Sequence, residues 1–343
     1  MKDKITILGG GSWGTAIAQL LAKNGHQVMI YDREEKIINS IKQKHINIGY
    51  FPEYTLSDKL MATNDLNKAV SFGDIVFMSV PTYATRDVMS QIEKLLRGNQ
   101  FIVSTAKGIE EKSFLRNSQI ISEYTNLPVA VLSGPTHAEE VMDELPTTAV
   151  ITCNNKEIAK KIQDIMMSST FRVYTNPDIV GIEIGGAIKN IIAVSAGIAD
   201  GLGYGDNTKA ALMTRGLHEM SRLGVYLGAK LLTFAGLTGM GDLVVTCTSM
   251  HSRNRRLGIK IGKGLGLDKA LESISQTVEG VRTTRAIYQW YIDNENELDF
   301  DIPITKQIYK VLFKNKDPME AVNDLMQRGP KHEIEEVIEN ISW

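Results

Sequence analysis

Cysteine is scarce in this sequence, with only Cys153 and Cys247 in 343 residues. Two widely separated cysteines exclude a disulfide framework and paired metal ligands, so we expect no metal site and a reducing, cytoplasmic location. The sequence also has no large excess of one charge, because it contains 38 lysines and arginines and 40 aspartates and glutamates. Such a chain has no overall field to hold it on nucleic acid, so any anion must bind at a local cluster.

Long apolar segments free of charge are also missing. The early run over residues 5–8 is too short for the apolar core of a secretion signal before glycines interrupt it. The longest weakly polar stretch, residues 179–201, carries Glu183, Lys189 and Asp200, charges that a membrane span seldom contains. We therefore predict a buried helix there, no stable membrane anchoring and, from the chain length, two compact domains.

The first half of the chain alternates short β-rich apolar runs with amphipathic stretches, a pattern typical of a parallel sheet with crossover helices. Between the first two runs, residues 15–23 have apolar side chains at helical spacing, and Asn24-Gly25 supplies a helix stop. The expected strands are 5–8, 28–31, 74–80, 101–104, 129–132, 147–152 and 171–174.

From about residue 178 the pattern changes to long amphipathic segments, which predicts an all-helical second half that ends in a surface helix over 333–343. The expected architecture is an α/β dinucleotide-binding domain of Rossmann type with a mostly parallel sheet over residues 1–180. An all-α substrate and catalytic domain is expected over residues 181–343.

Gly9, Gly11 and Gly14 form a G-x-G-x-x-G motif. As a bare motif this spacing is weak evidence, but here it follows a strand, opens a helix and lies in a βαβ unit of the expected length. Gly9 lets the chain turn tightly, Gly11 lets the backbone approach a pyrophosphate, and Gly14 lets helix and strand pack closely. The helix N-terminus then offers N–H groups and a positive dipole end to phosphates.

The second strand ends at Asp32-Arg33, about 20 residues after the glycines. An acid at this place binds the ribose hydroxyls of NAD, whereas an arginine beside it neutralises the 2′-phosphate of NADP. The residues therefore leave both coenzymes open.

Loops at the carboxyl ends of parallel strands are the usual place for ligands. Pro81 fixes the chain where it leaves the third expected strand, either as a plain terminator or as a cofactor contact. Lys107, after the fourth, can reach an anionic substrate or a cofactor. The loop 133–138, with small and hydroxylated residues, suits a pocket wall. His137 in this loop is a ligand contact or, as we favour, a structural histidine.

In the expected helix over 179–201, Lys189-Asn190 interrupts an apolar pattern just after the glycine pair Gly185-Gly186. Interior glycines cost roughly 1 kcal/mol each against alanine, so close packing or a ligand must compensate. A lysine among apolar neighbours has its pKa lowered toward the range useful for acid–base catalysis. Near the C-terminal third, Ser252-Arg253-Asn254 offers a guanidinium, a hydroxyl and an amide, a local cluster suited to a phosphate.

Six segments together carry a family resemblance: 9–16, 106–110, 132–140, 186–190, 239–243 and 251–254. In this order they resemble the bacterial NAD(P)-dependent glycerol-3-phosphate dehydrogenases, over residues 5 to about 315. The resemblance implies a homodimer that reversibly reduces dihydroxyacetone phosphate to sn-glycerol 3-phosphate with NAD(H) or NADP(H). It also implies that the product supplies glycerophospholipid synthesis.

The resemblance further assigns roles to residues. Lys189 matches the catalytic proton donor and acceptor. Positions that hold the substrate are matched by Lys107, Gly134, Thr136, Lys189, Asp242, Ser252, Arg253 and Asn254. Besides Gly9, Gly11 and Gly14, the positions that match coenzyme contacts are Ser12, Trp13, Arg33, Tyr50, Lys107, Ala138, Arg253, Val278 and Glu279.

Two other interpretations compete with this one. Dehydrogenases of 3-hydroxy acids or of 6-phosphogluconate also place a lysine beside an asparagine on a helix, but the arginine cluster and the segment 133–140 argue against them. A non-catalytic NAD(P)-sensing module would have the same fold without needing Lys189, Asp242 and Arg253 together. The sequence leaves open the coenzyme preference, the favoured direction, feedback control and the dimer contacts.

Overall fold

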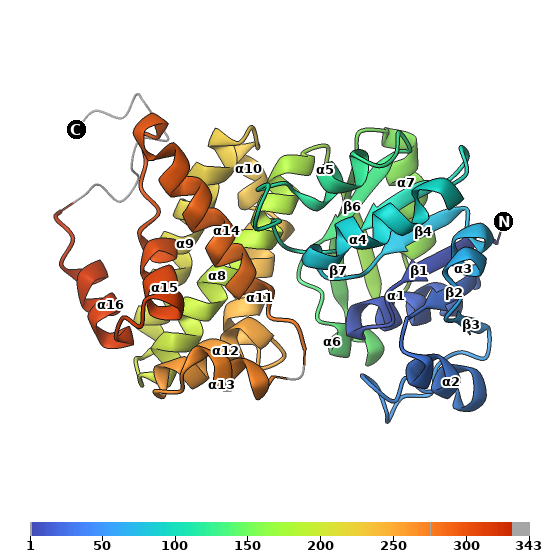
Figure 1. Ribbon diagram of the computed structural model, residues 1–343, viewed down its shortest axis with the longest axis horizontal. Helices are drawn as coiled ribbons and strands as arrows, with labels where there is room; N and C mark the ends of the chain where they lie inside the picture. Colours follow the sequence, from blue (N-terminus) through green and yellow to red (C-terminus); the bar gives the residue numbers. More distant parts are fainter. Residues whose placement is uncertain (1, 275, 331–343) are drawn as a thin grey trace.

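A computed structural model describes residues 2–274 and 276–330 of the chain. The surface helix expected over 333–343 lies outside the described residues. Figure 1 shows two parts side by side. We call residues 4–175, which hold the sheet, the sheet region, and residues 179–326 the helical region.

The sheet region contains one eight-stranded sheet in the order β3-β2-β1-β4-β5-β6-β7-β8. Its strands are β1 Lys4–Leu8, β2 Gln27–Tyr31, β3 Leu60–Thr63, β4 Ile75–Met78, β5 Phe101–Ser104, β6 Val129–Ser133, β7 Thr147–Cys153 and β8 Phe171–Thr175. Neighbours pair in parallel except β6 and β7, which are antiparallel. The order of the first six strands reverses direction beside β1, and in such sheets ligands bind at that switch point.

Side chains alternate between the two faces of this sheet along each strand, and both faces are buried. In β4, Ile75 and Phe77 face one hydrophobic core, whereas Val76 and Met78 face another. The first core is covered by α1 Ser12–Lys23, α2 Glu35–Lys44, α6 Ala138–Met142 and α7 Lys156–Met166. The second is covered by α3 Leu66–Phe72, α4 Thr82–Ile92 and α5 Asn117–Ser122, with the short η1 Glu93–Leu95 after α4.

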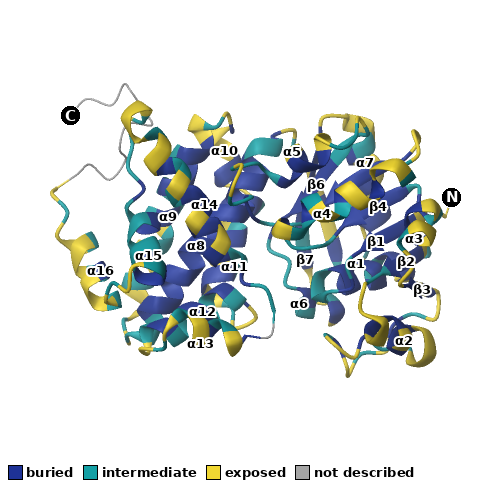
Figure 2. Cartoon of the chain, viewed as in Figure 1, coloured by how far each residue is buried: buried dark blue, intermediate teal, exposed yellow. Residues whose placement is uncertain are grey.

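The described part of the helical region contains no strand. Its elements are α8 Ile179–Gly201, α9 Asp206–Tyr226, α10 Leu231–Phe234, η2 Leu237–Gly241, α11 Asp242–Thr248, α12 Arg253–Gly262, α13 Leu267–Glu272, α14 Glu279–Asn294, η3 Glu295–Glu297, α15 Pro303–Phe313 and α16 Pro318–Met326. Figure 2 shows α8 buried at the centre, while α16 on the outside is largely exposed.

The predicted mostly parallel sheet and helical second half are confirmed, and α8 has the bounds expected of the buried helix. Two details were wrong. The short edge strand β3 was missed, because it has only four residues and Met61 in its middle is exposed, so no apolar run marks it. The first helix begins at Ser12, one turn earlier than expected, because Gly11 precedes it as the N-cap.

Close packing of α8 against α12 sets the geometry of the site. A Cβ on Gly197 of α8 would lie 2.1 Å from the Arg255 carbonyl oxygen, and one on Gly258 of α12 would lie 2.1 Å from the Val194 oxygen. These glycines let the two backbones touch. The N-terminus of α12 is thereby held beside the middle of α8.

Two stretches of the described chain, Ile179–Gly201 and Leu231–Thr248, are long and apolar enough to cross a membrane by length and composition. The most apolar window of the first is 89% buried inside the protein, as a core helix would be, and that of the second is 44% buried. Length and apolar character alone are therefore weak evidence for a membrane span here.

Candidate active site

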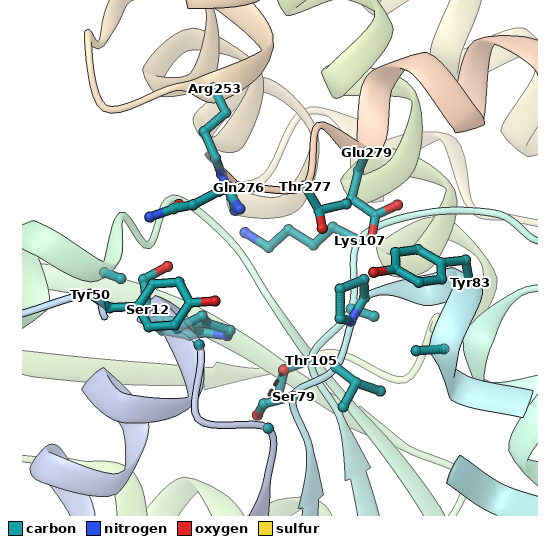
Figure 3. Close-up of a pocket in the computed structure, with 18 of the residues that line it drawn as sticks. Ser12, Tyr50, Ser79, Tyr83, Thr105, Lys107, Arg253, Gln276, Thr277 and Glu279 are labelled. Carbon is teal, nitrogen blue, oxygen red and sulfur yellow. Dashed lines mark hydrogen bonds between the residues drawn. The ribbon is translucent and has the colours of Figure 1, made fainter. Parts of the chain in front are cut away.

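A cavity of about 570 Å³ lies where the carboxyl ends of the strands meet the helical region. That volume is in the range of pockets for small ligands and cofactors. Figure 3 shows Ser12, Ser79 and Thr105 lining it from the sheet region. Arg253 and Glu279 face them from the helical region.

One end of this cavity, which we call the glycine end, is formed by the turn between β1 and α1. Gly9 has a φ of +112°, which favours glycine, and a Cβ on Gly14 would lie 1.9 Å from the Gly9 carbonyl oxygen. A Cβ on Gly11 would meet only Tyr50, at 4.0 Å, because this position opens toward the cavity. The backbone of Gly11 and the start of α1 are therefore accessible to a ligand.

Asn47, which the sequence analysis did not single out, braces this turn. Its buried amide nitrogen donates to the Gly10 carbonyl oxygen at 2.9 Å and to the Thr15 hydroxyl at 2.8 Å. No motif marks this residue, because it acts from a loop far along the chain.

The end of β2 shows how the two candidate coenzyme-selecting residues differ. The Asp32 carboxylate accepts the N–H groups of Gly10 at 2.7 Å and Glu34 at 2.9 Å, so it braces the turn. Arg33 is exposed, lines the cavity and makes no ion pair among the described residues. The Arg33 guanidinium is therefore available to bind a ligand, whereas the Asp32 carboxylate is already hydrogen-bonded.

Two lysines and one carboxylate form the other end of the cavity, which we call the lysine end. Lys107, after β5, donates to Asp242 Oδ2 at 3.0 Å, and Lys189, on α8, donates to Asp242 Oδ1. Lys189 also donates to the Thr246 hydroxyl at 2.9 Å. Lys189 and Asp242 are buried, so one negative charge is shared between two cations with little water near it.

The surroundings move the pKa values of this pair. Burial is the largest cause that lowers the pKa of Lys189 to about 7, with Lys107 adding to it and Asp242 opposing it. Burial alone would raise the pKa of Asp242, but the attraction of Lys107 and Lys189 outweighs it and lowers that pKa. Lys189 can therefore gain or lose a proton near neutral pH while Asp242 stays charged.

An amide chain joins the elements around the lysines. The Asn190 side chain donates to the Lys107 carbonyl oxygen at 3.0 Å and accepts from the Asn254 amide at 2.8 Å. The Asn254 oxygen in turn accepts the Gly280 N–H at 2.9 Å. Because its amide is engaged on both sides, Asn254 fixes the starts of α12 and α14 relative to α8.

The Ser252–Asn254 cluster is divided by the structure into two roles. The Ser252 hydroxyl accepts the Arg255 N–H at 3.2 Å and so caps α12. Arg253 lines the cavity and makes no ion pair among the described residues. Its guanidinium is the part of the cluster left to receive an anion.

Glu279 joins the two regions from the helical side. Its carboxylate accepts the Thr82 N–H at the start of α4 at 3.0 Å. Burial raises the pKa of Glu279, while the Thr82 N–H and Arg253 counteract it. The residue thus holds the cavity wall together.

Most of the residues predicted for the site line this one cavity: Gly9, Gly11, Ser12, Trp13, Arg33, Tyr50, Lys107, Thr136, Ala138, Lys189, Asp242, Ser252, Arg253, Asn254 and Glu279. Three others lie behind the wall. Gly14 is packed within the turn, Gly134 offers its carbonyl oxygen to Lys107 at 2.7 Å, and Val278 belongs to the helical core.

His137 also lines the cavity, and its Nε2 atom is buried without a hydrogen-bond partner among the described residues. Thr246, Gln276 and Tyr83 line it too, and the sequence analysis missed them. Thr246 could have been found, because it follows Asp242 by one helical turn on α11 and so shares its face.

The glycine end fits a dinucleotide. The cradle at Gly11 is open, the α1 N-terminus faces the cavity, and the indole N–H of Trp13 is buried there without a partner from residues 2–274 or 276–330. Such an arrangement suits a pyrophosphate and a further polar group of a cofactor. Among the described residues no group of three or more His, Cys, Asp or Glu side chains could hold a metal ion.

Comparison with family models gives two matches that follow each other along the chain. Residues 4–159 match the N-terminus of NAD-dependent glycerol-3-phosphate dehydrogenase, and residues 178–323 match its C-terminus.

Individual relatives agree with these matches. The glycerol-3-phosphate dehydrogenase [NAD(P)+] of Halothermothrix orenii is 66% identical over 343 residues, which is 100% of both chains. That of Clostridium acetobutylicum is 50% identical over 96% of this chain and 98% of its own. The crystal structure of glycerol-3-phosphate dehydrogenase from Coxiella burnetii has a TM-score of 0.91 at 36% identity, covering 95% of this chain and 99% of that one.

Proposed function

The chain belongs to the NAD-dependent glycerol-3-phosphate dehydrogenase family, and from this premise we propose which of its residues carry the reaction. It is an NAD(P)-dependent oxidoreductase that interconverts dihydroxyacetone phosphate and sn-glycerol 3-phosphate. The observation that supports our assignment best is that Lys107 and Lys189 share Asp242 at one end of a cavity whose other end is the glycine turn.

The coenzyme binds at the glycine end. The Gly11 backbone and the α1 N-terminus hold its pyrophosphate, with Ser12 and Trp13 beside them. Tyr50, Ala138 and Glu279 surround the rest, with Val278 packed behind them, and Arg33 meets the 2′-phosphate when NADP(H) is bound. When bound, the reduced coenzyme supplies the hydride.

Lys189 moves the proton. Reduction turns the ketone carbon into an alcohol, and negative charge develops on its oxygen, which the Lys189 ammonium stabilises and then protonates. In the oxidation direction the neutral amine takes the hydroxyl proton. Asp242 and Thr246 hold the Lys189 Nζ atom, and Lys107 adds a second positive charge beside the substrate.

The substrate phosphate goes to Arg253. This guanidinium lines the cavity without an ion pair in the described part of the chain, and a planar donor suits a phosphate. Ser252, Asn254 and Thr136 complete the wall around the substrate, and Gly134 lies behind this wall and holds Lys107.

Four further properties belong to the same proposal. Residues 1–180 form the dinucleotide-binding domain, and residues 181–343 form the substrate and catalytic domain. The protein is a homodimer and lies in the cytoplasm. Its product enters glycerophospholipid synthesis. Size-exclusion chromatography with light scattering tests the dimer.

The direct test mixes the protein with NADH or NADPH and dihydroxyacetone phosphate, and follows the absorbance of the reduced coenzyme. We expect turnover that depends on the phosphate of the substrate. Reduction of a 3-oxo acid in place of dihydroxyacetone phosphate would overturn the proposal, and so would coenzyme binding without any turnover.

A further inference from the structure

His137 lies at the lysine end of the cavity, yet the chemistry above gives it no role. It precedes α6 directly, and its ring centroid lies 5.8 Å from that of His251, which lines the same cavity. Its Nε2 atom is shut off from solvent and has no hydrogen-bond partner in the described part of the chain. A histidine kept only for the fold normally has its ring nitrogens bonded, so the unpartnered Nε2 atom indicates a role in binding a ligand.

The ring is neutral at physiological pH. Burial first, and then the charge of Lys189, lower the pKa of His137 to about 4, although Asp242 opposes the shift. A neutral imidazole has one N–H donor and one acceptor nitrogen. It can therefore accept a hydrogen bond from a hydroxyl, which an ammonium or a guanidinium cannot do.

The acceptors that bond to the two lysines are already engaged. The two Asp242 oxygens accept from Lys107 and Lys189. The Gly134 carbonyl accepts from Lys107 at 2.7 Å, and the Thr246 hydroxyl accepts from Lys189 at 2.9 Å. A hydroxyl that enters this end meets cationic donors, and the imidazole is a neutral acceptor beside them.

The substrate brings such a hydroxyl. Dihydroxyacetone phosphate has three polar parts: the phosphate, which we assign to Arg253, the carbonyl, which we assign to Lys189, and a free hydroxymethyl group. We propose that His137 recognises this hydroxymethyl group by a hydrogen bond between its hydroxyl and the imidazole. A turn of the ring about its Cβ–Cγ bond, a soft torsion, lets the ring meet a seated hydroxyl.

His137 is thus a specificity-determining residue. It favours a phosphorylated ketone with a hydroxyl next to the carbonyl over one with a methyl group there, such as acetol phosphate. This inference rests on the proposed function, because it takes the carbonyl to lie at Lys189.

The test compares kcat/KM for dihydroxyacetone phosphate and acetol phosphate in His137→Leu, which removes both ring nitrogens at similar volume. We expect kcat/KM for dihydroxyacetone phosphate to fall about tenfold to a hundredfold, because a buried hydroxyl loses its partner. The value for acetol phosphate should change little, so the ratio between the two ketones falls by the same factor. His137→Gln, which keeps an acceptor, should recover much of the ratio.

The matched control is His26→Leu, at the opposite end of the strands, where the His26 ring accepts the Asp3 N–H. It should leave the ratio between the ketones unchanged. If a thermal melt shows that His137→Leu does not fold, His137→Asn decides, because asparagine is too short to reach the hydroxyl and should lower the ratio in the same way.

Equal losses on both ketones would overturn the inference in favour of a scaffold role. An unchanged ratio with weaker NADH binding would overturn it in favour of a coenzyme contact. Either result in an enzyme that still reduces dihydroxyacetone phosphate leaves the proposed function standing. Failure of the unmodified protein to reduce this ketone would reject the proposed function itself.

Discussion

At the glycine end of the cavity the backbone presents the binding groups, whereas at the lysine end buried charged side chains do. Gly9 and Gly14 shape a turn in which a single Cβ would collide with backbone. Lys189 and Asp242 instead depend on each other's charge in a place with little water. The two ends should therefore fail differently, the first by steric change and the second by loss of charge or of a proton.

The largest effect is expected from Lys189→Met, which keeps the apolar stem and removes the charge and the proton. Turnover should fall about 10² to 10⁴-fold, and further if the charge also stabilises the developing alkoxide. Coenzyme affinity, measured by fluorescence titration, should change little, whereas the melting temperature should fall, because Asp242 stays buried and keeps only its contact with Lys107 among these two lysines.

Lys189→Arg is the matched control for that change. Arginine keeps the charge but hardly gives up its proton, so this variant should also be nearly inactive. Substantial turnover in a folded, coenzyme-binding Lys189→Met protein would exclude the assignment and direct attention to Lys107.

A pair of glycine variants tests the other end. In Gly14→Ala the new Cβ would lie 1.9 Å from the Gly9 oxygen, so overpacking should cost about 1–3 kcal/mol of unfolding free energy, seen in urea titrations. In Gly11→Ala the Cβ points into open space, so stability should hold while affinity for both coenzymes falls. Equal stability losses in the two variants would contradict this division.

Arg33→Ala should affect one coenzyme selectively. Loss of a charge-assisted contact to the 2′-phosphate should weaken NADPH by roughly tenfold to a hundredfold and leave NADH nearly unchanged. The Asp32 carboxylate is held by two backbone N–H groups and should keep the turn intact in this variant. Isothermal titration with each coenzyme measures the difference, and equal losses would disprove the role of Arg33.

The smallest change is expected in Arg253→Lys, which keeps the charge and loses the planar fork. Catalytic efficiency on dihydroxyacetone phosphate should fall by about tenfold. Turnover of unphosphorylated dihydroxyacetone should be nearly unaffected. A similar loss on both ketones would point to a structural or coenzyme role for Arg253.

The sequence was most informative where local pattern and local structure coincide. Most of the buried strands are near-continuous apolar runs and were predicted, whereas the short edge strand β3 was missed. The glycine motif and α8 are likewise marked by local sequence pattern, so their positions in the fold could be predicted.

Contacts between distant segments could not be predicted in this way. Asn47 braces the turn from 37 residues away, and Asn254 bonds to Asn190 across 64 residues. Similarly, Ser252 was predicted as a ligand contact and lines the cavity, but its second role, the cap that its hydroxyl gives to α12, was not predicted. Which polar atoms stay free for a ligand depends on such tertiary pairings, and composition and spacing do not encode them.

The pH dependence of kcat/KM in the two directions tests the central claim most directly, namely that Lys189 exchanges the substrate's proton. With a Lys189 pKa of about 7, reduction needs the ammonium and should fall tenfold per pH unit above that value. Oxidation needs the neutral amine and should rise with pH to a plateau above the same value. A flat profile for reduction between pH ~7 and ~9, or profiles of the same sign in both directions, would contradict the account.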